Sequence, residues 1–331
     1  MSSRIFVTDP IANNPFRRID VHHHYFPSDL RKEKSNAEVG WKTPAENLPW
    51  SPEVSLRAMD AMNIDVAILS FPALSSGSIS EENRSLTKAR NEFASSICRS
   101  HPGRFGFFAT LPYLDDIEGS LREIAYAMDT LHANGVSISS CYGEGYVGDI
   151  QYDPIWTELN RRQAVVFLHG SQFPSSTPFP HPTLGIPITE VPNETFKAAA
   201  HLVVTGHRRK FPKIKIILAH LGGTVPMLVP RVAVLSNHMG CNLTPEEIIE
   251  DFKSFYYETA LSAYEPNLAA IERLVNPDHI LFGTDFPAVG KDMVEWFTNN
   301  VKKYYEGDSD RLCRIMSDNA TKLFCSNTSS T

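Results

Sequence analysis

The 331-residue sequence has little cysteine and no long apolar run. Its five cysteines are scattered and form no Cys-x-x-Cys pair, which argues against a disulfide framework or a Cys-ligated zinc site and indicates a reducing compartment. No stretch approaches the roughly 20 apolar residues of a membrane span, and residues 1–11 lack the apolar region of a signal peptide. We therefore expect a cytoplasmic protein with no membrane partner.

Positive charge is also scarce, with 31 Lys and Arg against 38 Asp and Glu, a net charge of -7 and a pI near 5.9. No dense Lys/Arg block is present to bind phosphates, so we expect no nucleic-acid partner. The hydrophobic (42%) and charged (21%) fractions are ordinary for a globular protein. The length fits one α/β barrel with insertions, and we expect a single domain over residues 1–331.

Short apolar runs alternate with segments of helical character along the whole chain. Strands separated by helices pair in parallel, and eight such units most economically close into a (β/α)8 TIM barrel, about residues 16–305, followed by C-terminal helices over 306–325. An open doubly wound sheet is the alternative, but its first strand would usually end in a glycine-rich turn, where this chain has histidines. The first expected strand lies within residues 18–27 and is stopped by Pro27. The other seven are 66–70, 105–109, 136–139, 164–168, 214–219, 255–258 and 280–282.

Two segments interrupt this alternation. Residues 28–50 are rich in turn formers and predict a loop or small insertion after the first strand. Residues 171–192, which contain six prolines, predict a long loop after the fifth strand. Long loops without secondary structure often act as lids or specificity elements, and a contact between subunits is the alternative.

The first expected strand ends in a histidine cluster that Pro27 terminates. Because side chains alternate along a strand, His22 and His24 project to one side and His23 to the other. Two rigidly held imidazoles on one face are half of a transition-metal site, whereas three ordinary surface or core histidines are the alternative.

Chemistry in a parallel barrel lies at the carboxyl ends of its strands. There, His169 ends the fifth strand, His220 the sixth and Asp285 follows the eighth. The set His22, His24, His169 and Asp285 suits one divalent ion such as Zn²⁺ or Mn²⁺, with a coordination position left for water or substrate. His220 is then better placed as a proton donor or acceptor than as a further ligand.

These strand ends resemble the metal-dependent amidohydrolase superfamily, and within it the aminocarboxymuconate-semialdehyde decarboxylase group, which includes fungal 6-methylsalicylate decarboxylases. Residues 50–54, Trp-Ser-Pro-Glu-Val, resemble the group's Trp-Asp-Pro-Glu-Val stretch. The resemblance implies that His22, His24, His169 and Asp285 are the metal ligands. It also implies that His220 is the catalytic acid or base, alone or together with Asp285.

Several details refine the resemblance. Residues 136–140 carry no lysine of the kind that bridges two metals in binuclear members, so we expect one metal. Leu48-Pro49 stand where the semialdehyde enzyme has an arginine, which favours a simpler aromatic acid. Arg231, eleven residues beyond His220, matches an arginine that binds a substrate carboxylate in the neighbouring subunit. This match implies a homodimer, and a surface arginine is the alternative.

The resemblance implies non-oxidative decarboxylation of a small ortho-hydroxy aromatic acid, with 6-methylsalicylate to 3-methylphenol as the leading expectation. Ring protonation at the carbon that bears the carboxylate would avoid an aryl anion, with His220 or Asp285 as the proton donor. The candidates for the wall of the substrate pocket are Phe26, Trp50, Phe71 and Phe286. The alternatives are a mononuclear hydrolase or hydratase on the same barrel, and a barrel whose metal is structural or sensory.

Overall fold

The computed structural model describes residues 17–73, 77–172 and 180–325. Its centre is a sheet of eight parallel strands in the order β1-β2-β3-β4-β7-β8-β9-β10, and a short antiparallel hairpin is formed by β5 and β6. The strands are β1 (Ile19–His24), β2 (Val66–Ser70), β3 (Phe105–Thr110), β4 (Gly135–Ser139), β5 (Cys141–Tyr142), β6 (Gly145–Tyr146), β7 (Val165–His169), β8 (Lys215–Leu218), β9 (Tyr256–Glu258) and β10 (Ile280–Leu281).

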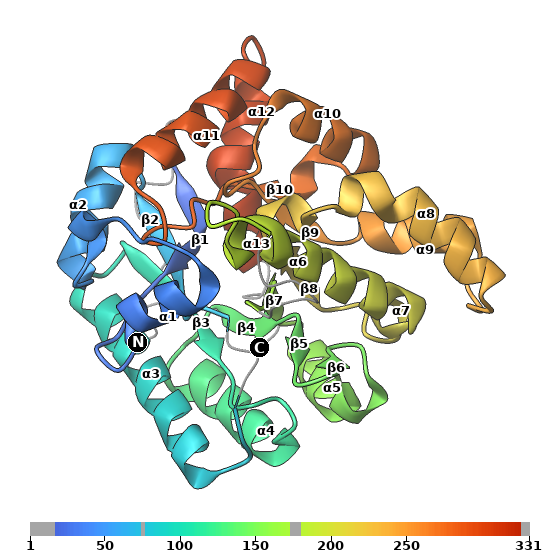
Figure 1. The fold of residues 1–331 in the computed structure, drawn as a ribbon, viewed down its shortest axis with the longest axis horizontal. Helices are drawn as coiled ribbons and strands as arrows, with labels where there is room; N and C mark the ends of the chain where they lie inside the picture. The colour runs from blue at the N-terminus through green and yellow to red at the C-terminus, as the bar shows by residue number, and fades with distance from the viewer. Residues whose placement is uncertain (1–16, 74–76, 173–179, 326–331) are drawn as a thin grey trace.

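The sheet closes on itself between its first and last strands. The backbone N–H of Val21 donates to the carbonyl of Phe282 (3.0 Å), and the N–H of His24 donates to that of Phe286 (2.7 Å). These bonds join β1 to the segment that leaves β10, so the strands form a barrel (Figure 1). The predicted (β/α)8 barrel is confirmed, and the open-sheet alternative is wrong.

Helices surround the strands (Figure 1). Several begin with proline in their first turn, where its missing N–H has no intrahelical partner, and a capping box of Thr244 and Glu247 starts α9. The helices are α1 (Lys32–Val39), α2 (Pro52–Met62), α3 (Glu81–Ser100), α4 (Ile117–Ala125), α5 (Asp153–Arg161), α6 (Ile186–Val204), α7 (His207–Lys210), α8 (Val225–His238), α9 (Pro245–Lys253), α10 (Glu265–Leu274), α11 (Lys291–Tyr304), α12 (Ser309–Cys313) and α13 (Asn319–Cys325). Among the described residues, no helix has the length and apolar character needed to cross a membrane.

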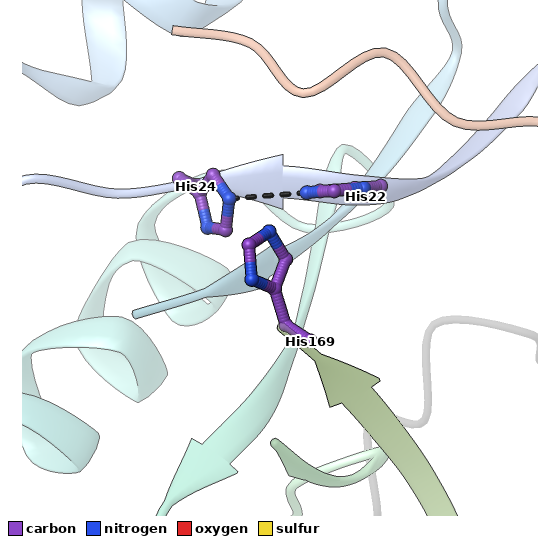
Figure 2. Close-up of side chains that lie close together, drawn as sticks. All are labelled: His22, His24 and His169. Carbon is purple, nitrogen blue, oxygen red and sulfur yellow. Dashed lines mark hydrogen bonds between the residues drawn. The ribbon is translucent and has the colours of Figure 1, made fainter. Parts of the chain in front are cut away.

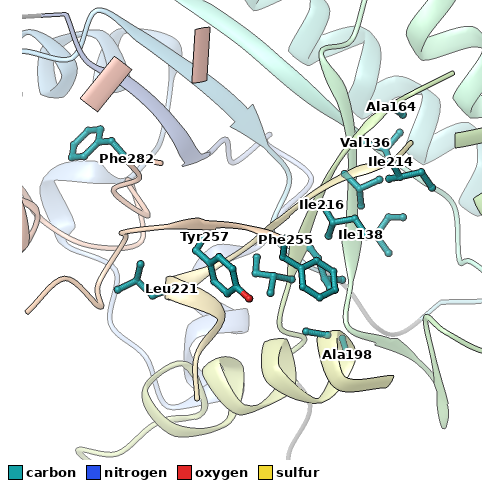
Figure 3. Packing of buried hydrophobic residues seen from close by; sticks show 14 of the residues in the cluster. Val136, Ile138, Ala164, Ala198, Ile214, Ile216, Leu221, Phe255, Tyr257 and Phe282 are labelled. Atoms are coloured by element: carbon teal, nitrogen blue, oxygen red, sulfur yellow. The ribbon is translucent and has the colours of Figure 1, made fainter. Parts of the chain in front are cut away.

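The strands are buried on both faces, which explains why they read as continuous apolar runs. Between the barrel and its helices, residues such as Ile138, Ile216 and Tyr257 pack against the helical layer (Figure 3). Inside the barrel, Phe108 stacks on Phe167 with ring centroids 5.5 Å apart. Apolar side chains of α13 join this inner cluster, together with residues from the first positions of the strands. The barrel is therefore filled and closed at one end, which leaves the carboxyl ends of the strands for a site.

The two segments predicted as loops are partly helical. Within residues 28–50, α1 and the short 3-10 turn Ala45–Asn47 are formed. The expected loop over 171–192 is shorter than predicted because α6 already begins at Ile186, with Pro187 in its first turn and Pro192 inside it. Proline is compatible with the first turn of a helix, so the density of prolines was misleading there. Pro174 and Pro178 of this segment lie outside the described residues.

An irregular step in β1 orients the histidine cluster. Asp20 lies opposite Ala67 of β2, whereas His23 lies opposite Leu69, so three residue steps on β1 face two on β2. Such a bulge inserts one residue and shifts the alternation of side chains. As a result Val21 belongs to the inner apolar cluster and His22 also packs inward, against Phe167 at 4.9 Å between ring centroids.

Candidate metal centre and active site

The structure brings His22, His24 and His169 together at the carboxyl ends of β1 and β7. One ring nitrogen from each of the three lies within 4.8 Å of the others, and all three residues are buried. Figure 2 shows His22 and His24 projecting from the same strand and His169 pointing toward them from β7. The three imidazoles therefore form a group that can share one metal ion.

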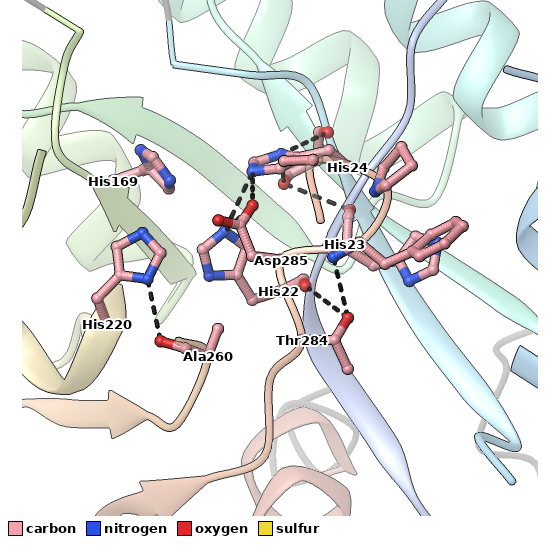
Figure 4. Close-up of polar contacts among 12 residues, drawn as sticks. His22, His23, His24, His169, His220, Ala260, Thr284 and Asp285 are labelled. Atoms are coloured by element: carbon pink, nitrogen blue, oxygen red, sulfur yellow. Dashed lines mark hydrogen bonds and ion pairs between the residues drawn. The ribbon is translucent and has the colours of Figure 1, made fainter. Parts of the chain in front are cut away.

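Asp285 lies next to this group, in the segment that follows β10. Its Oδ1 is 3.4 Å from Nε2 of His22 and 3.2 Å from Nε2 of His24 (Figure 4). Its backbone has a φ of +63°, a left-handed conformation that is uncommon for a residue other than glycine. Its N–H donates to the carbonyl of His22 (2.8 Å), which fixes the two segments together.

Hydrogen bonds at Nδ1 determine which nitrogen each imidazole presents. His22 donates from Nδ1 to Glu258 (2.8 Å), and His169 donates to the neighbouring backbone carbonyl (2.8 Å). Nδ1 of His24 lies 3.2 Å from the carbonyl oxygen of Ser70. Carboxylate and carbonyl oxygens accept hydrogen bonds, so Nδ1 carries a proton in the His22 and His169 rings and Nε2 faces the site. A hydrogen bond from Nδ1 of His24 to the Ser70 carbonyl, with the Ser70 hydroxyl 3.0 Å away, orients that ring in the same way. This is the orientation that a metal-binding histidine needs.

The separations of these atoms fit a shared divalent ion. Nε2 of His22 and Nε2 of His24 are 3.1 Å apart, and both would be lone-pair donors to a bound ion. Ligands held at about 2.0–2.2 Å from one ion lie roughly 3 Å from one another, which matches the three distances among His22, His24 and Asp285. The donor set of imidazoles and one carboxylate suits Zn²⁺ or Mn²⁺.

The electrostatics of the site favour a positive charge at its centre. Burial opposes protonation of His22, but the carboxylates of Glu258 and Asp285 outweigh it and raise its pKa to about 10. Burial lowers the pKa of His24 and that of His169, so these rings are neutral. Although burial opposes ionisation of Asp285, the His22 imidazole holds the pKa of that carboxyl well below its usual range. Without a metal, His22 therefore carries the positive charge between the two carboxylates. A bound metal ion would take over that attraction, and His22 would then give up its Nε2 proton, because a ligating imidazole must be neutral.

His220 approaches the same point from the turn after β8. Its φ is +57°, and its backbone N–H donates to Oε1 of Glu258 (2.5 Å). Its Nδ1–H donates to the carbonyl of Ala260 (3.1 Å), so Nε2 is the nitrogen left for chemistry (Figure 4). The His220 ring lies 4.9 Å from that of His22 and lines the cavity described below.

Glu258 was not among the predicted site residues. It ends β9, is fully buried, and accepts hydrogen bonds from the His22 ring, the His220 N–H and the Ala260 N–H (2.6 Å). It therefore orients the ring of one candidate ligand and the backbone of the candidate acid at once. The available signal was its place at the carboxyl end of an expected strand, which is where the other site residues were found.

A cavity of about 240 Å³ adjoins this cluster. The candidate ligands His24, His169 and Asp285 and the ring of His220 form its polar side, and apolar side chains form most of the rest. Its described lining is His24, Phe26, Lys32, Trp41, Pro72, Ala73, His169, Gln172, Pro187, Ile188, Val191, Pro192, His220, Leu261, Ser262, Asp285, Ala288, Val289, Met293 and Phe297.

Of the aromatic residues predicted for the pocket wall, Phe26 belongs to the described lining of this cavity, whereas Trp50, Phe71 and Phe286 do not. Phe286 packs against the His23 ring at 5.1 Å between centroids, on the other side of β1. Trp50 donates from Nε1 to the hydroxyl of Ser55 (3.0 Å), and Phe71 lines a second cavity of about 30 Å³. Arg231 is exposed on α8.

The closed barrel and its inward-facing imidazoles define a class, the metal-dependent α/β-barrel enzymes. Within that class, the chain belongs to the amidohydrolase family, whose model matches residues 19–325. It is 36% identical over 322 residues to the 6-methylsalicylic acid decarboxylase acuB of Aspergillus aculeatus, covering 93% of this chain and 96% of that protein. It is 37% identical over 316 residues to the 6-methylsalicylic acid decarboxylase of Penicillium expansum, with the same coverage.

The fold is shared with solved decarboxylases. A dihydroxybenzoic acid decarboxylase from Polaromonas, with bound manganese and the inhibitor 2-nitroresorcinol, superimposes with a TM-score of 0.77 at 23% identity, over 95% of this chain and 99% of that one. A 2,6-dihydroxybenzoate decarboxylase in complex with 2,6-dihydroxybenzoate gives a TM-score of 0.76 at 23% identity, over 93% and 98% of the two chains.

Proposed function

We propose that this protein is a metal-dependent, non-oxidative decarboxylase that converts 6-methylsalicylate to 3-methylphenol and CO₂. The observation that carries the proposal is the likeness, over 93% of the chain, to two fungal enzymes named for 6-methylsalicylic acid decarboxylation. The cavity agrees with it, because about 150 Å³ already accommodates benzene and 240 Å³ leaves room for ring substituents.

The metal would be held by His22, His24, His169 and Asp285, since the three histidines present ring nitrogens to one another and Oδ1 of Asp285 lies beside two of them. When bound, a divalent ion such as Mn²⁺ or Zn²⁺ supplies a Lewis acid for the phenolate and carboxylate oxygens of the substrate. The apolar side chains of the cavity enclose the aromatic ring and exclude water from it. This arrangement fixes the ring with its carboxylate at the polar side.

His220 is the group that we assign to proton delivery. Direct loss of CO₂ would leave an aryl anion, so the ring carbon that bears the carboxylate must be protonated first. Nε2 of His220 serves that step because Nδ1 is held by Ala260, whereas Oδ1 of Asp285 already faces two ligand nitrogens. The C–C bond then breaks, its electron pair returns to the ring, aromaticity is restored and CO₂ leaves.

The proposal extends to a homodimer in which Arg231 of one subunit binds the substrate carboxylate in the site of the other. The surface around Arg231 on α8 supports it, because Met227, Val234 and Leu235 are 63%, 57% and 43% exposed on the same helix. Large apolar side chains exposed together often mark a protein contact.

The test is to incubate the Mn²⁺-loaded protein with 6-methylsalicylate and to follow CO₂ and 3-methylphenol. In D₂O, the product should carry one deuterium at the ring position that the carboxylate leaves. Absence of turnover with every 2-hydroxybenzoate tried would refute the proposal. Incorporation of ¹⁸O from labelled water into the organic product would instead identify a hydrolase or hydratase.

A further inference from the structure

Lys32, the first residue of α1, is an unusual component of the cavity wall. It is 8% exposed, although lysine is among the residues least often buried without a partner. It is the only Lys or Arg side chain among the described residues that line the cavity. Its ammonium lies over the face of the Phe26 ring, with Nζ 4.8 Å from the ring centroid.

The described part of the chain gives this ammonium no hydrogen-bond acceptor and no ion pair. A buried charge without such a partner is costly, and burial correspondingly lowers the pKa of Lys32, against the attraction of Asp285. The cation–π contact with Phe26 compensates only in part. An anion bound in the cavity would supply the missing partner.

The helix that carries Lys32 is fixed over the cavity. Trp41, just after α1, donates from Nε1 to the carbonyl of Ala288 (2.9 Å), and both residues line the cavity. Val39 packs with Ile186 and Val191 at the start of α6. The helix that carries the ammonium is therefore held in the wall by the segment after β10 and by the start of α6.

We propose that Lys32 is a specificity-determining residue, whose ammonium binds the carboxylate of the aromatic substrate within the same subunit. The inference rests on the proposed function for the identity of the substrate, and it adds a cation from the chain's own cavity to the one proposed for Arg231. Because the carboxylate loses its charge as CO₂ forms, this ion pair is weaker in the transition state than in the bound substrate. Lys32 should therefore contribute to affinity and not to the rate of the chemical step.

The first test is Lys32→Met, which keeps the length of the side chain and removes its charge. Steady-state kinetics with 6-methylsalicylate should show KM raised about 10- to 100-fold, as for loss of a charged hydrogen bond, with kcat unchanged or slightly higher. The thermal midpoint should stay the same or rise, because an unpartnered buried charge is lost. Lys34→Met is the matched control, since that lysine lies on the same helix and its side chain is 72% exposed.

A second measurement needs no turnover. Calorimetry on the Mn²⁺-loaded protein compares benzoate with benzamide, its uncharged analogue, and Lys32→Met should reduce the preference for benzoate at least fivefold. If the protein does not decarboxylate 6-methylsalicylate but Lys32→Met still loses the preference for benzoate over benzamide, that result would support the anion site and refute only the proposed function. An unchanged KM and an unchanged preference would overturn the inference, as would a lower thermal midpoint together with a fall in kcat alone.

Discussion

Both sides of β1 carry histidine, but the histidines on the two sides make different contacts. On the side that faces the barrel mouth, His22 and His24 turn their Nε2 atoms toward Asp285 and a cavity. On the other side, His23 lies between Asp20 (2.9 Å from Nδ1) and Ser55 (2.8 Å from Nε2). This is the hydrogen-bonding order of a hydrolytic Ser-His-Asp triad.

The triad-like group cannot act as one. Asp20, His23 and Ser55 are each 0% exposed, and none lines the cavity. Their hydrogen bonds are used internally: Trp50 donates to the Ser55 hydroxyl (3.0 Å), and the Thr284 hydroxyl donates to Asp20 (2.6 Å). A constellation of residues therefore predicts chemistry only where a substrate can reach it, and this group instead fixes α2 and the segment before Asp285 to β1.

The largest effect that separates the two sides is expected from His24→Ala. It removes one of the candidate ligands, so bound metal should fall from one ion per chain to a trace, and turnover should fall about 10³-fold or more. Elemental analysis and CO₂ release measure both. His23→Gln is the control on the other side of the strand and should retain its metal. Equal loss of metal in both variants would contradict the assignment of His24, and not His23, as a ligand.

The next largest effect is expected from His220→Asn. Asparagine can keep a hydrogen bond to the carbonyl of Ala260 but cannot deliver a proton, so kcat should fall about 10²- to 10⁴-fold. Bound metal should remain at one ion per chain, because His220 is not among the ligands proposed here. Loss of metal from the His220→Asn protein would instead indicate that His220 is one of the metal ligands.

The ends of the strands could be predicted from the sequence because they depend on local patterns. Apolar runs followed by histidine or aspartate located His169, His220 and Asp285, and the topology of a closed barrel then brought them together. The Pro-rich start of α6 could not be predicted, because proline is compatible with both a loop and a first helical turn. The packing that holds α1 could not be predicted either, because its contacts come from residues remote in the sequence.

The direction of individual side chains was the other limit. Trp50 and Phe286 were expected in the pocket wall, but both pack around the Ser55–His23 side of β1. The sequence pattern around an aromatic residue near a strand end is the same whether its side chain faces a core or a cavity. Glu258 was overlooked for a related reason: its function depends on three donors that come from remote parts of the chain.

A smaller effect on the inward side is expected from Glu258→Gln. The amide replaces one acceptor oxygen by an NH₂ group, which then meets a donor from the His22 ring or from the backbone of His220 or Ala260. Loss of such orientation should raise the dissociation constant for Mn²⁺ about 10- to 100-fold. Metal titration measures it, with the exposed Glu265→Gln as control. Unchanged metal affinity would show that His22 needs no support from this carboxylate.

The smallest effect on turnover is expected from Ser55→Ala, on the side of His23. The substitution leaves Nε2 of His23 without its donor and the Trp50 N–H without its acceptor, in a fully buried place. The free energy of unfolding should fall by about 1–3 kcal/mol, while kcat and bound metal stay unchanged. Denaturant titration and kinetics on the same preparation measure both, and Ser100→Ala, at an exposed position on α3, is the control. A fall in kcat without a fall in stability would mean that the buried group takes part in the reaction after all, because a network that only fixes the fold should alter stability first.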